Sequence, residues 1–397
     1  MKRVAILTAG FAPVPAVDGG AVETLTTQLI NANEKYKWAQ FDVYTVSNPK
    51  LDTLKYDNTI IIQAKRTSPI IAFSIRVFNK ICSMLHLPFA YGINDWSIVD
   101  SFLEKEYDAV LFENNMHIYH LFQKKYLSKY ALFFHLHNSI ENDPGKPPRL
   151  SHEIANSAKG IITVSDYIHK QMDEYQPSRI KTVYNCADSD VFRPVSSEER
   201  KKIRYQYGIQ DDEFVVLYGG RMTPEKGILE LILALKKLNL NYNKKVHLLI
   251  AGKNWFNSRT ESKYAQILKE AVEGIHWIDF TGYVENHKIY ELYNAVDITT
   301  VPSIIDEAFG MTALESLLCS TPVIASNRGG LPEVVSNDVG LVVEYNEHFV
   351  DNIAGAILHY INNRDAYISA KKNCREYALG KFGQIESYYK NIMKEIG

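Results

Sequence analysis

The stretch LYGGRMTPEKGILELILALKKL, residues 217–238, decides the fold of this chain. An apolar run ends in it, two glycines follow, and a helical pattern with a long apolar face comes next. A second apolar run, VHLLIAGK, occupies residues 246–253. An apolar strand, a crossover helix and another apolar strand are typical of a parallel sheet that helices cover on both faces.

The same alternation recurs along the 397 residues. The first half contains the runs RVAILTA, FDVYTVS, AVLFEN, ALFFHLH, GIITVSD and KTVYN, and the second half contains EFVVLYGG, VHLLIAGK, IDFTGY, DITTVPS, TPVIASN and GLVVEY. These are about twice the strands of one open sheet, and the length suits two domains of about 200 residues. The polar segment 188–204, which contains Pro194, is the expected linker. The sequence therefore predicts an α/β protein with two doubly wound domains.

The composition excludes several classes of protein. With 46% apolar residues, 23% charged residues and a net charge of −2, the chain has no basic excess that indicates nucleic-acid binding. The apolar run near the N-terminus is too short for a signal peptide, and no run reaches the ~18–20 residues of a membrane span. The four cysteines are scattered, which favours reduced, buried thiols in a cytoplasmic protein.

In doubly wound folds, ligands bind beyond the carboxyl ends of the strands. Gly19 and Gly20 precede a helical pattern there, and an anion suits such a site, although a plain helix-entry turn is the simpler interpretation. In the second half, Thr223 and Pro224 indicate a helix start with Lys226 in its first turn. A cation there opposes the helix dipole at a cost of about 0.3–1 kcal/mol, so solvated charges or a bound polyanion are the two interpretations.

The stretch DEAFGMTALES, residues 306–316, contains two glutamates. Thr312 and Glu315 have the spacing of a capping box, in which Glu315 bonds back to the start of a helix. Glu307 lies before that helix, in the loop. We expect Glu307 to face the crevice at the strand ends, beside the N–H groups of residues 310–312.

The run ALFFHLHNSIEND places His135 and His137 at a strand end. Side chains alternate along a strand, so both point the same way. Such a pair is structural, or binds a metal when a third ligand joins it. The sequence shows no third ligand.

Several motifs occur in one order: Gly19–Gly20, GGRMTPEKG (219–227), FTGYVENHKIYELYNAVDITTVPSIIDEAFGMTALES (280–316) and TPVIASNRGGLPEVV (321–335). In this order they resemble the retaining family 4 glycosyltransferases of the GT-B fold, whose hallmark is two glutamates separated by seven residues. Glu307 and Glu315 meet that spacing. The resemblance covers nearly the whole chain and is strongest in the second half.

The resemblance implies roles for the matching residues. Arg221 and Lys226 would bind the donor diphosphate and steady the leaving group. Glu307 would lie at the transferred sugar, and Glu315 would hold the ribose hydroxyls instead of capping a helix. His137, followed by Asn138, would contact the transferred sugar. The other donor-binding positions would surround the sugar, the base and the diphosphate: Gly19, Gly20, Gly282, Tyr283, Phe309, Gly310, Met311 and Thr312.

The resemblance also implies the domain plan. An acceptor-side Rossmann-like domain would span residues 1–193, a nucleotide-sugar domain would span 198–379, and a cleft would separate them. The tail, about 380–397, would form a final helix that packs back on the first domain. One departure is IAGKNW, which lacks a common glycine after Gly252, so that Lys253 to Asn257 would contact the base differently.

No metal and no cofactor besides the nucleotide sugar are expected. Asp188-Ser189-Asp190 spells the DxD metal motif of another glycosyltransferase fold. Here it falls in a segment that resembles the family's interdomain pattern, matched by Asn185, Asp188, Phe192 and Pro194. Arg221, Lys226 and helix termini would supply the positive field instead.

The sequence thus predicts a retaining hexosyltransferase that moves a sugar from a nucleotide-sugar donor, most simply a UDP-sugar, to a glycan or lipid-linked acceptor in polysaccharide or glycoconjugate assembly. The alternatives are a nucleotide-sugar epimerase or hydrolase of similar fold and a non-catalytic sugar-nucleotide-binding protein. The absence of a GxGxxG motif after any strand argues against a dinucleotide-dependent oxidoreductase.

Residues 64–90 carry Lys65, Arg66, Arg76 and Lys80 and no acidic residue. A basic amphipathic helix binds an anionic membrane surface. An ordinary helix packed on the first sheet is the alternative. We therefore expect a cytoplasmic protein with peripheral attachment to the inner face of the membrane, or a wholly cytoplasmic one.

Overall fold

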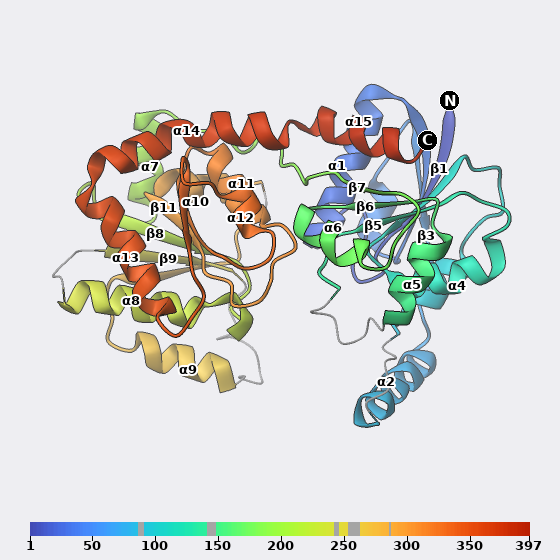
Figure 1. Cartoon of the computed structure of the whole chain (residues 1–397), viewed down its shortest axis with the longest axis horizontal. Helices are drawn as coiled ribbons and strands as arrows, with labels where there is room; N and C mark the ends of the chain where they lie inside the picture. The colour runs from blue at the N-terminus through green and yellow to red at the C-terminus, as the bar shows by residue number, and fades with distance from the viewer. Residues whose placement is uncertain (86–90, 141–147, 242–245, 253–262, 286) are drawn as a thin grey trace. The chain divides into compact units, whose positions relative to one another are not determined.

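A computed structural model describes residues 1–85, 91–140, 148–241, 246–252, 263–285 and 287–397 (Figure 1). The chain divides into two compact units: unit 1 is Met1–Asn185 with Ile385–Gly397, and unit 2 is Cys186–Gln384. Each unit is a parallel sheet covered by helices, which is the doubly wound architecture that the alternating apolar runs predicted.

Unit 1 contains a sheet in the order β3-β2-β1-β4-β5-β6-β7. Its strands are β1 (Lys2–Leu7), β2 (Ala39–Thr45), β3 (Thr59–Gln63), β4 (Ala109–Glu113), β5 (Leu132–Leu136), β6 (Gly160–Thr163) and β7 (Ile180–Thr182). Its helices are α1 (Ala21–Tyr36), α2 (Pro69–Met84), α3 (Asp95–Asp100), α4 (Met116–Tyr126), α5 (Pro148–Ser157), α6 (Asp166–Asp173) and α15 (Ile385–Glu395), with a short 3-10 turn at η1 (Pro49–Thr53). The edge strand β3 was not among the predicted strands.

Unit 2 contains a sheet in the order β10-β9-β8-β11-β12-β13. Its strands are β8 (Phe214–Gly219), β9 (Val246–Ala251), β10 (Ile278–Gly282), β11 (Ile298–Val301), β12 (Val323–Ser326) and β13 (Gly340–Val343). Its helices are α7 (Ser197–Gln206), α8 (Ile228–Asn241), α9 (Lys263–Val272), α10 (Ile289–Ala295), α11 (Met311–Leu318), α12 (Leu331–Val334), α13 (Phe349–Asn362) and α14 (Arg364–Phe382), with a 3-10 turn at η2 (Pro224–Lys226). All six strands predicted in the second half of the sequence are present.

Apolar packing between strands and helices forms the core of unit 2. α8 packs on α13 on one side of the sheet, whereas α10 packs on α11 on the other. Leu231 and Leu235 of α8 meet Leu248 of β9 and Ile357 of α13, and all four side chains are fully buried. Because both faces of the strands are covered, their sequences are continuous apolar runs instead of alternating ones.

The strand order places the ligand-binding end of each sheet. In unit 1 the order reverses between β1 and β4, and in unit 2 it reverses between β8 and β11. Loops on either side of such a switch point diverge to opposite faces of the sheet and leave a crevice at the carboxyl ends of the strands. The loops after β1 and β4, and after β8 and β11, are therefore the places to look for chemistry.

The division between the units falls at Asn185 and Cys186, ahead of the expected linker at 188–204. Much of that segment is held inside unit 2. α7 begins at Ser197, and the buried Arg204 donates to the carbonyl of Ala295 at 2.9 Å and pairs with Asp297. The polar segment 188–204 is therefore only in part a linker, because its second half belongs to the helix α7, which packs in unit 2.

The C-terminal tail contains one helix, α15, which starts a few residues later than the predicted position of about 380. α14 ends at Phe382, and Gly383 adopts a positive φ of 72° before α15 begins. α15 belongs to unit 1 and packs on α1, where Tyr36 donates to Glu386 at 3.0 Å. All four cysteines are free and buried. No described helix combines the length and apolar character that crossing a bilayer requires.

Candidate active site

In unit 2 the loops after β8 and β11 bring two predicted site residues together. β8 pairs with β11, so their carboxyl ends are adjacent. Lys226, in the turn η2, places its Nζ 2.5 Å from Oε1 of Glu307. The hydroxyl of Ser303 also donates to that oxygen. The side chains of Lys226 and Glu307 remain 20% and 18% exposed, so a ligand can reach the pair.

Close backbone packing fixes this pair. Gly227 has a φ of 67°, and a Cβ there would lie 1.8 Å from the carbonyl oxygen of Pro302, so only glycine fits. Gly329 pairs with Glu307 in an isolated bridge, and the Gly330 N–H donates to the Glu307 carbonyl at 2.7 Å. Both the lysine and the glutamate are thus held by main-chain contacts.

The loop after β8 matches the predicted helix start in part. Thr223 precedes the 3-10 turn η2, Pro224 begins it and Lys226 lies in it, but Thr223 makes no side-chain cap and α8 begins only at Ile228. Lys226 thus lies two residues before α8, and its charge is paired with Glu307. Arg221 follows the strand with an exposed side chain, and the Tyr218 hydroxyl donates to its carbonyl at 2.6 Å.

The segment after Glu307 leads into α11. Phe309 is buried and packs edge-on against Phe382 with ring centroids 5.4 Å apart. Gly310 is the residue before the helix, with a φ of 116°, and no side chain caps the helix start. The first N–H groups of α11, at Met311 and Thr312, thus point out of the helix as hydrogen-bond donors. Such groups favour an anion or a hydroxyl oxygen.

The capping box expected from Thr312 and Glu315 is not formed. Both residues lie inside α11, because Gly310 precedes the helix and its first turn starts one residue before Thr312. Glu315 instead accepts a hydrogen bond of 2.8 Å from the Tyr293 hydroxyl. Burial raises the pKa of Glu315 to about 7, and the Tyr293 hydrogen bond opposes that rise only in part. Glu315 nevertheless keeps part of its surface exposed.

The predicted base-proximal residues lie at the end of β10. Gly282 has a φ of 74°, and its carbonyl accepts from the Gly252 N–H at 3.0 Å. Tyr283 is 58% exposed. The expected contacts of Lys253 to Asn257 with the base lie outside the described residues.

In unit 1 the glycine pair opens α1 as predicted. Gly19 and Gly20 have φ values of 83° and 111°, and a Cβ on Gly20 would lie 2.2 Å from Oε2 of Glu23. Leu25 and Leu29 are buried on one face of the helix, whereas Ala21 is exposed. The pair satisfies the simple helix-entry interpretation, and its binding role stays a prediction.

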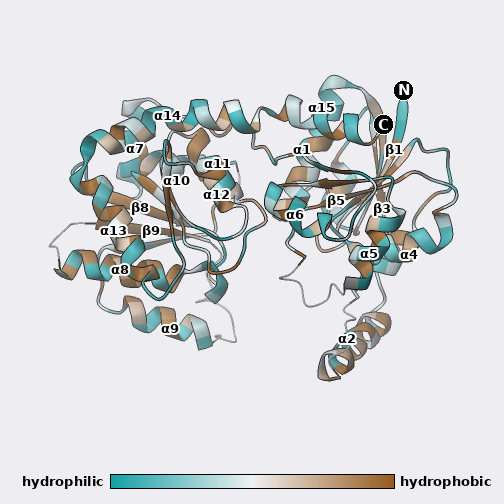
Figure 2. Cartoon of the chain, viewed as in Figure 1, coloured by the Kyte–Doolittle hydropathy of each residue, from teal (hydrophilic) through white to brown (hydrophobic). Residues whose placement is uncertain are grey.

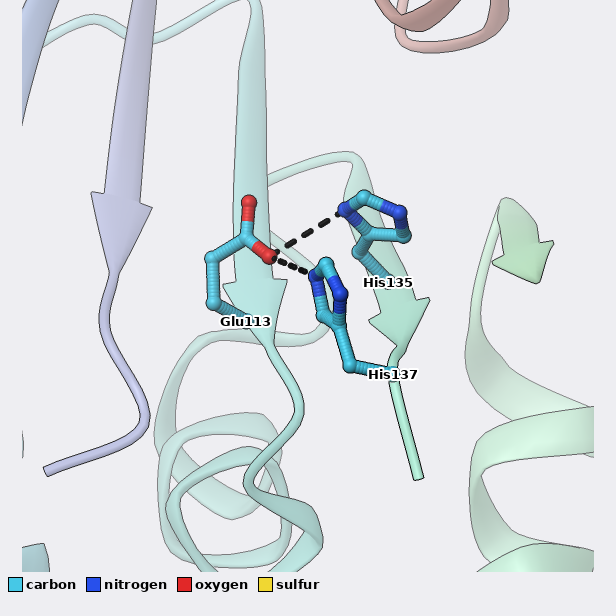
Figure 3. Close-up of side chains that lie close together, drawn as sticks. All are labelled: Glu113, His135 and His137. Carbon is cyan, nitrogen blue, oxygen red and sulfur yellow. Dashed lines mark hydrogen bonds and ion pairs between the residues drawn. The ribbon is translucent and has the colours of Figure 1, made fainter. Parts of the chain in front are cut away.

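The two histidines of unit 1 meet a third residue that the sequence analysis missed. Figure 3 shows the Glu113 side chain, from the end of β4, pointing at His135 and His137. Oε2 of Glu113 lies 2.7 Å from Nε2 of His137 and 3.1 Å from Nδ1 of His135. All three side chains are buried. Both histidines point the same way, as the alternation along the strand predicted. The available signal was an acidic residue that closes the buried run AVLFE.

Glu113, His135 and His137 are the described residues that come nearest to a metal centre, with ligand atoms within 4.8 Å of one another. Two ligands of a tetrahedral zinc ion, each at about 2.0–2.1 Å, are about 3.3 Å apart. The distances of 2.7 and 3.1 Å between Glu113 and the two rings are shorter. The contact with His137 is a hydrogen bond, and the contact with His135 is within ion-pair distance. The DxD segment serves a turn, since Oδ1 of Asp188 accepts from the Asp190 N–H at 2.9 Å.

The helix α2 of unit 1 is an amphipathic helix whose apolar residues are exposed. Cys82 is its only buried residue among those described. The exposed apolar side chains include Ile70 at 79% and Phe73 at 65%. Figure 2 shows apolar residues along α2 where it projects from the rest of its unit. The alternative of an ordinary helix packed on the first sheet does not describe α2.

Comparisons with known proteins agree with this architecture. Residues 199–379 match the family described as "Glycosyl transferases group 1". The chain is 25% identical over 395 residues to the protein YtcC of Bacillus subtilis (strain 168), covering 96% of this chain and 88% of YtcC. It is 28% identical over 271 residues to lipopolysaccharide 1,2-N-acetylglucosaminetransferase of Salmonella typhimurium, covering 66% of each chain. The structure of Anabaena HepE in complex with UDP-glucose aligns with a TM-score of 0.71 at 18% identity, over 99% of each chain.

Proposed function

We propose that this chain is a group 1 glycosyltransferase, because residues 199–379 match that family and the chain has the same fold as HepE. It would transfer a hexose or related sugar from a UDP-sugar to a glycan or lipid-linked acceptor, with retention of configuration and without a divalent ion. The observation that carries the proposal is the Lys226–Glu307 pair at the switch point of unit 2. A lysine for phosphate and a glutamate for sugar hydroxyls, held 2.5 Å apart, suit the junction of a sugar and a diphosphate.

The donor would lie across the strand ends of unit 2. Lys226 and Arg221 would bind the diphosphate, and the N–H groups at the start of α11 would bind sugar hydroxyls beside Glu307. Glu315, next to Tyr293, would accept from the ribose hydroxyls. HepE, a protein of the same fold, was crystallised with UDP-glucose, and this supports UDP as the carrier.

In the proposed reaction the bond between the anomeric carbon and the diphosphate oxygen breaks, and a bond to the acceptor oxygen forms on the same face of the sugar. The acceptor proton passes to an oxygen of the departing diphosphate. Negative charge grows on that diphosphate, and fixed cations and N–H groups that are already in place stabilise it most in the transition state. Turnover is then expected to persist in EDTA.

Product analysis with a panel of UDP- and GDP-sugars, with and without lipid-linked acceptors, tests the proposal. Transfer to acceptor with the anomeric configuration kept is the expected result. Release of free sugar, or isomerised donor, in the presence and absence of acceptor would favour the hydrolase or epimerase alternative. Nucleotide binding without any turnover would favour a non-catalytic binding protein.

We further propose that α2 docks this enzyme on an anionic membrane. The helix exposes Ile70 and Phe73 next to Arg76 and Lys80, which suits insertion into the headgroup region with cations at the lipid phosphates. The relative from Salmonella typhimurium is a lipopolysaccharide transferase, which supports a lipid-linked acceptor.

Flotation with liposomes tests the docking. The chain is expected to float with anionic vesicles, and Phe73→Asp is expected to abolish flotation. Leu103→Asp changes an apolar residue of unit 1 that is also exposed but lies outside α2, and it serves as the matched control. Equal flotation of both variants, or none of the unaltered chain, would refute the role of α2.

A further inference from the structure

Three consecutive residues at the end of β4 hold the ends of two neighbouring strands, β5 and β1, of unit 1. Glu113 binds the ring of His137, as described above. Asn114 accepts from the N–H groups of His137 and Asn138 at 2.9 and 3.0 Å. Asn115 donates to the carbonyl of Ala9, just beyond β1, at 2.8 Å. The ring and the main chain at His137 are therefore fixed from one side by a single short segment.

Asn114 adopts an unusual backbone conformation to do this. Its φ is 58°, in the left-handed region, where residues other than glycine are disfavoured. Its side chain is buried, and its own N–H donates to the His135 carbonyl at 2.9 Å. Strained residues that the surrounding contacts hold in place cluster at functional sites.

The charge of Glu113 is costly to bury, and apolar side chains would fill the same space without that cost. Burial by itself raises the pKa of Glu113, but attraction and hydrogen bonds from His135 and His137 outweigh it and lower the pKa to about 2. The carboxylate is thus ionised in the interior. The ionised carboxylate orients the ring of His137, because a charged hydrogen bond of 2.7 Å fixes the position of one ring nitrogen.

We propose that Glu113 and Asn114 are positioning residues, which hold the ring and main chain of His137 in the one orientation that meets the transferred sugar. This inference rests on the proposed function, together with the contact between His137 and that sugar which the family resemblance implies. In this proposal the cluster of Glu113, His135 and His137 holds the end of β5 in place before the sugar binds, and it does not bind a metal.

Glu113→Gln, which keeps the shape and removes the charge, tests the role of Glu113. We expect kcat to fall at least tenfold with the donor KM within threefold, and Glu113→Asp to recover part of kcat. The matched control is Asp42→Asn. Asp42 is also buried, in β2, and binds Lys105 and Tyr107 at 2.7 Å each. The control is expected to lose stability but keep kcat, and an unchanged kcat in Glu113→Gln would overturn the inference.

A readout independent of turnover separates this inference from the proposed function. In nitrogen-15 NMR of labelled histidines, His137 is expected to show one fixed state of its ring, and Glu113→Gln is expected to average it between states. An unchanged ring spectrum would overturn the inference even if the enzyme transfers sugar. The expected spectra would support it even if no transfer were found. Stoichiometric zinc or iron in the purified protein, measured by mass spectrometry, would also overturn it.

Discussion

Two glutamates at the switch points of two similar sheets have opposite environments. Glu307 in unit 2 pairs with Lys226 in a place where the two side chains are 18% and 20% exposed. Glu113 in unit 1 pairs with His137 where the two side chains are 2% and 3% exposed. The hydrogen-bond lengths are similar, at 2.5 and 2.7 Å.

The difference in exposure decides what each pair can do. An ion pair that water reaches contributes about 0–1 kcal/mol, so a ligand with its own charges can replace it at little cost. Breaking a buried pair by removing one partner costs about 3–5 kcal/mol, so such a pair stays closed through the reaction. We therefore interpret Lys226 and Glu307 as groups that exchange partners with the donor, and Glu113 and His137 as a fixed support.

The largest expected effect is on turnover. Glu307→Gln keeps the size of the side chain but removes the charge next to the transferred sugar. We expect kcat to fall by about 10²–10³, which is the loss typical for one electrostatic contact in a transition state. The dissociation constant for UDP, measured by calorimetry, is expected to change less than threefold.

The control for that experiment is Glu347→Gln, which changes an exposed glutamate of unit 2 whose side chain is 81% exposed. It is expected to leave both kcat and the UDP affinity unchanged. If Glu307→Gln lost affinity and kcat to the same degree, Glu307 would be a general donor-binding group, and the comparison between the two glutamates would weaken.

The second prediction compares stability. Glu113→Gln is expected to lower the free energy of unfolding by about 3 kcal/mol, because it leaves buried imidazoles without their anion. Glu307→Gln is expected to lower it by less than about 1 kcal/mol. Urea denaturation of both variants side by side measures the two changes. Equal losses would show that exposure does not separate the pairs.

The third prediction concerns the cation. Lys226→Gln is expected to weaken binding of the UDP-sugar by about 10–100-fold, because a charge-assisted hydrogen bond to phosphate contributes about 1.5–3 kcal/mol. Binding of uridine, which has no phosphate, is expected to stay the same. Calorimetry with both ligands checks this. An equal loss of affinity for uridine would show that Lys226 does not act on the phosphates.

The fold could be predicted from the sequence because its signal is local. Runs such as FVVLYG and VHLLIA are almost wholly apolar, as burial on both faces of a parallel sheet requires. The edge strand β3, TIIIQ, escaped because it is short and half-buried. The break between α14 and α15 depends on the backbone of one glycine, Gly383, inside an otherwise helical pattern.

Motifs in the sequence identified single candidate residues, but not which distant residues meet in the fold. Glu307 and Glu315 stand in one motif, whereas Glu113 and His137 are 24 residues apart and meet through the pairing of β4 and β5. No pattern in either segment of the sequence predicts that these two residues meet. The capping box did not form because the N-cap of α11 is Gly310, two residues before Thr312, the position that the spacing required.

Glu315 combines features of the two pairs, and the effect predicted for it depends on the pH. It is partly exposed, yet burial raises its pKa to about 7, above the ordinary value of 4.5. A carboxyl group whose pKa is raised on folding takes up a proton in the folded state, so its contribution to stability falls as the pH rises from about 4.5 to 7 and is constant above 7. Glu315→Gln is expected to remove that slope in the unliganded protein.

The same shift predicts how the nucleotide binds. If ribose hydroxyls donate to Glu315, binding selects the ionised carboxylate, and the apparent affinity for UDP falls by up to about tenfold for each pH unit below 7. Binding at pH 6 should then release close to one proton, and binding at pH 8 should release almost none. Calorimetry in two buffers of different ionisation enthalpy measures the number of protons. In Glu315→Gln both the pH dependence and the proton release should vanish, and their persistence would assign the titration to another group.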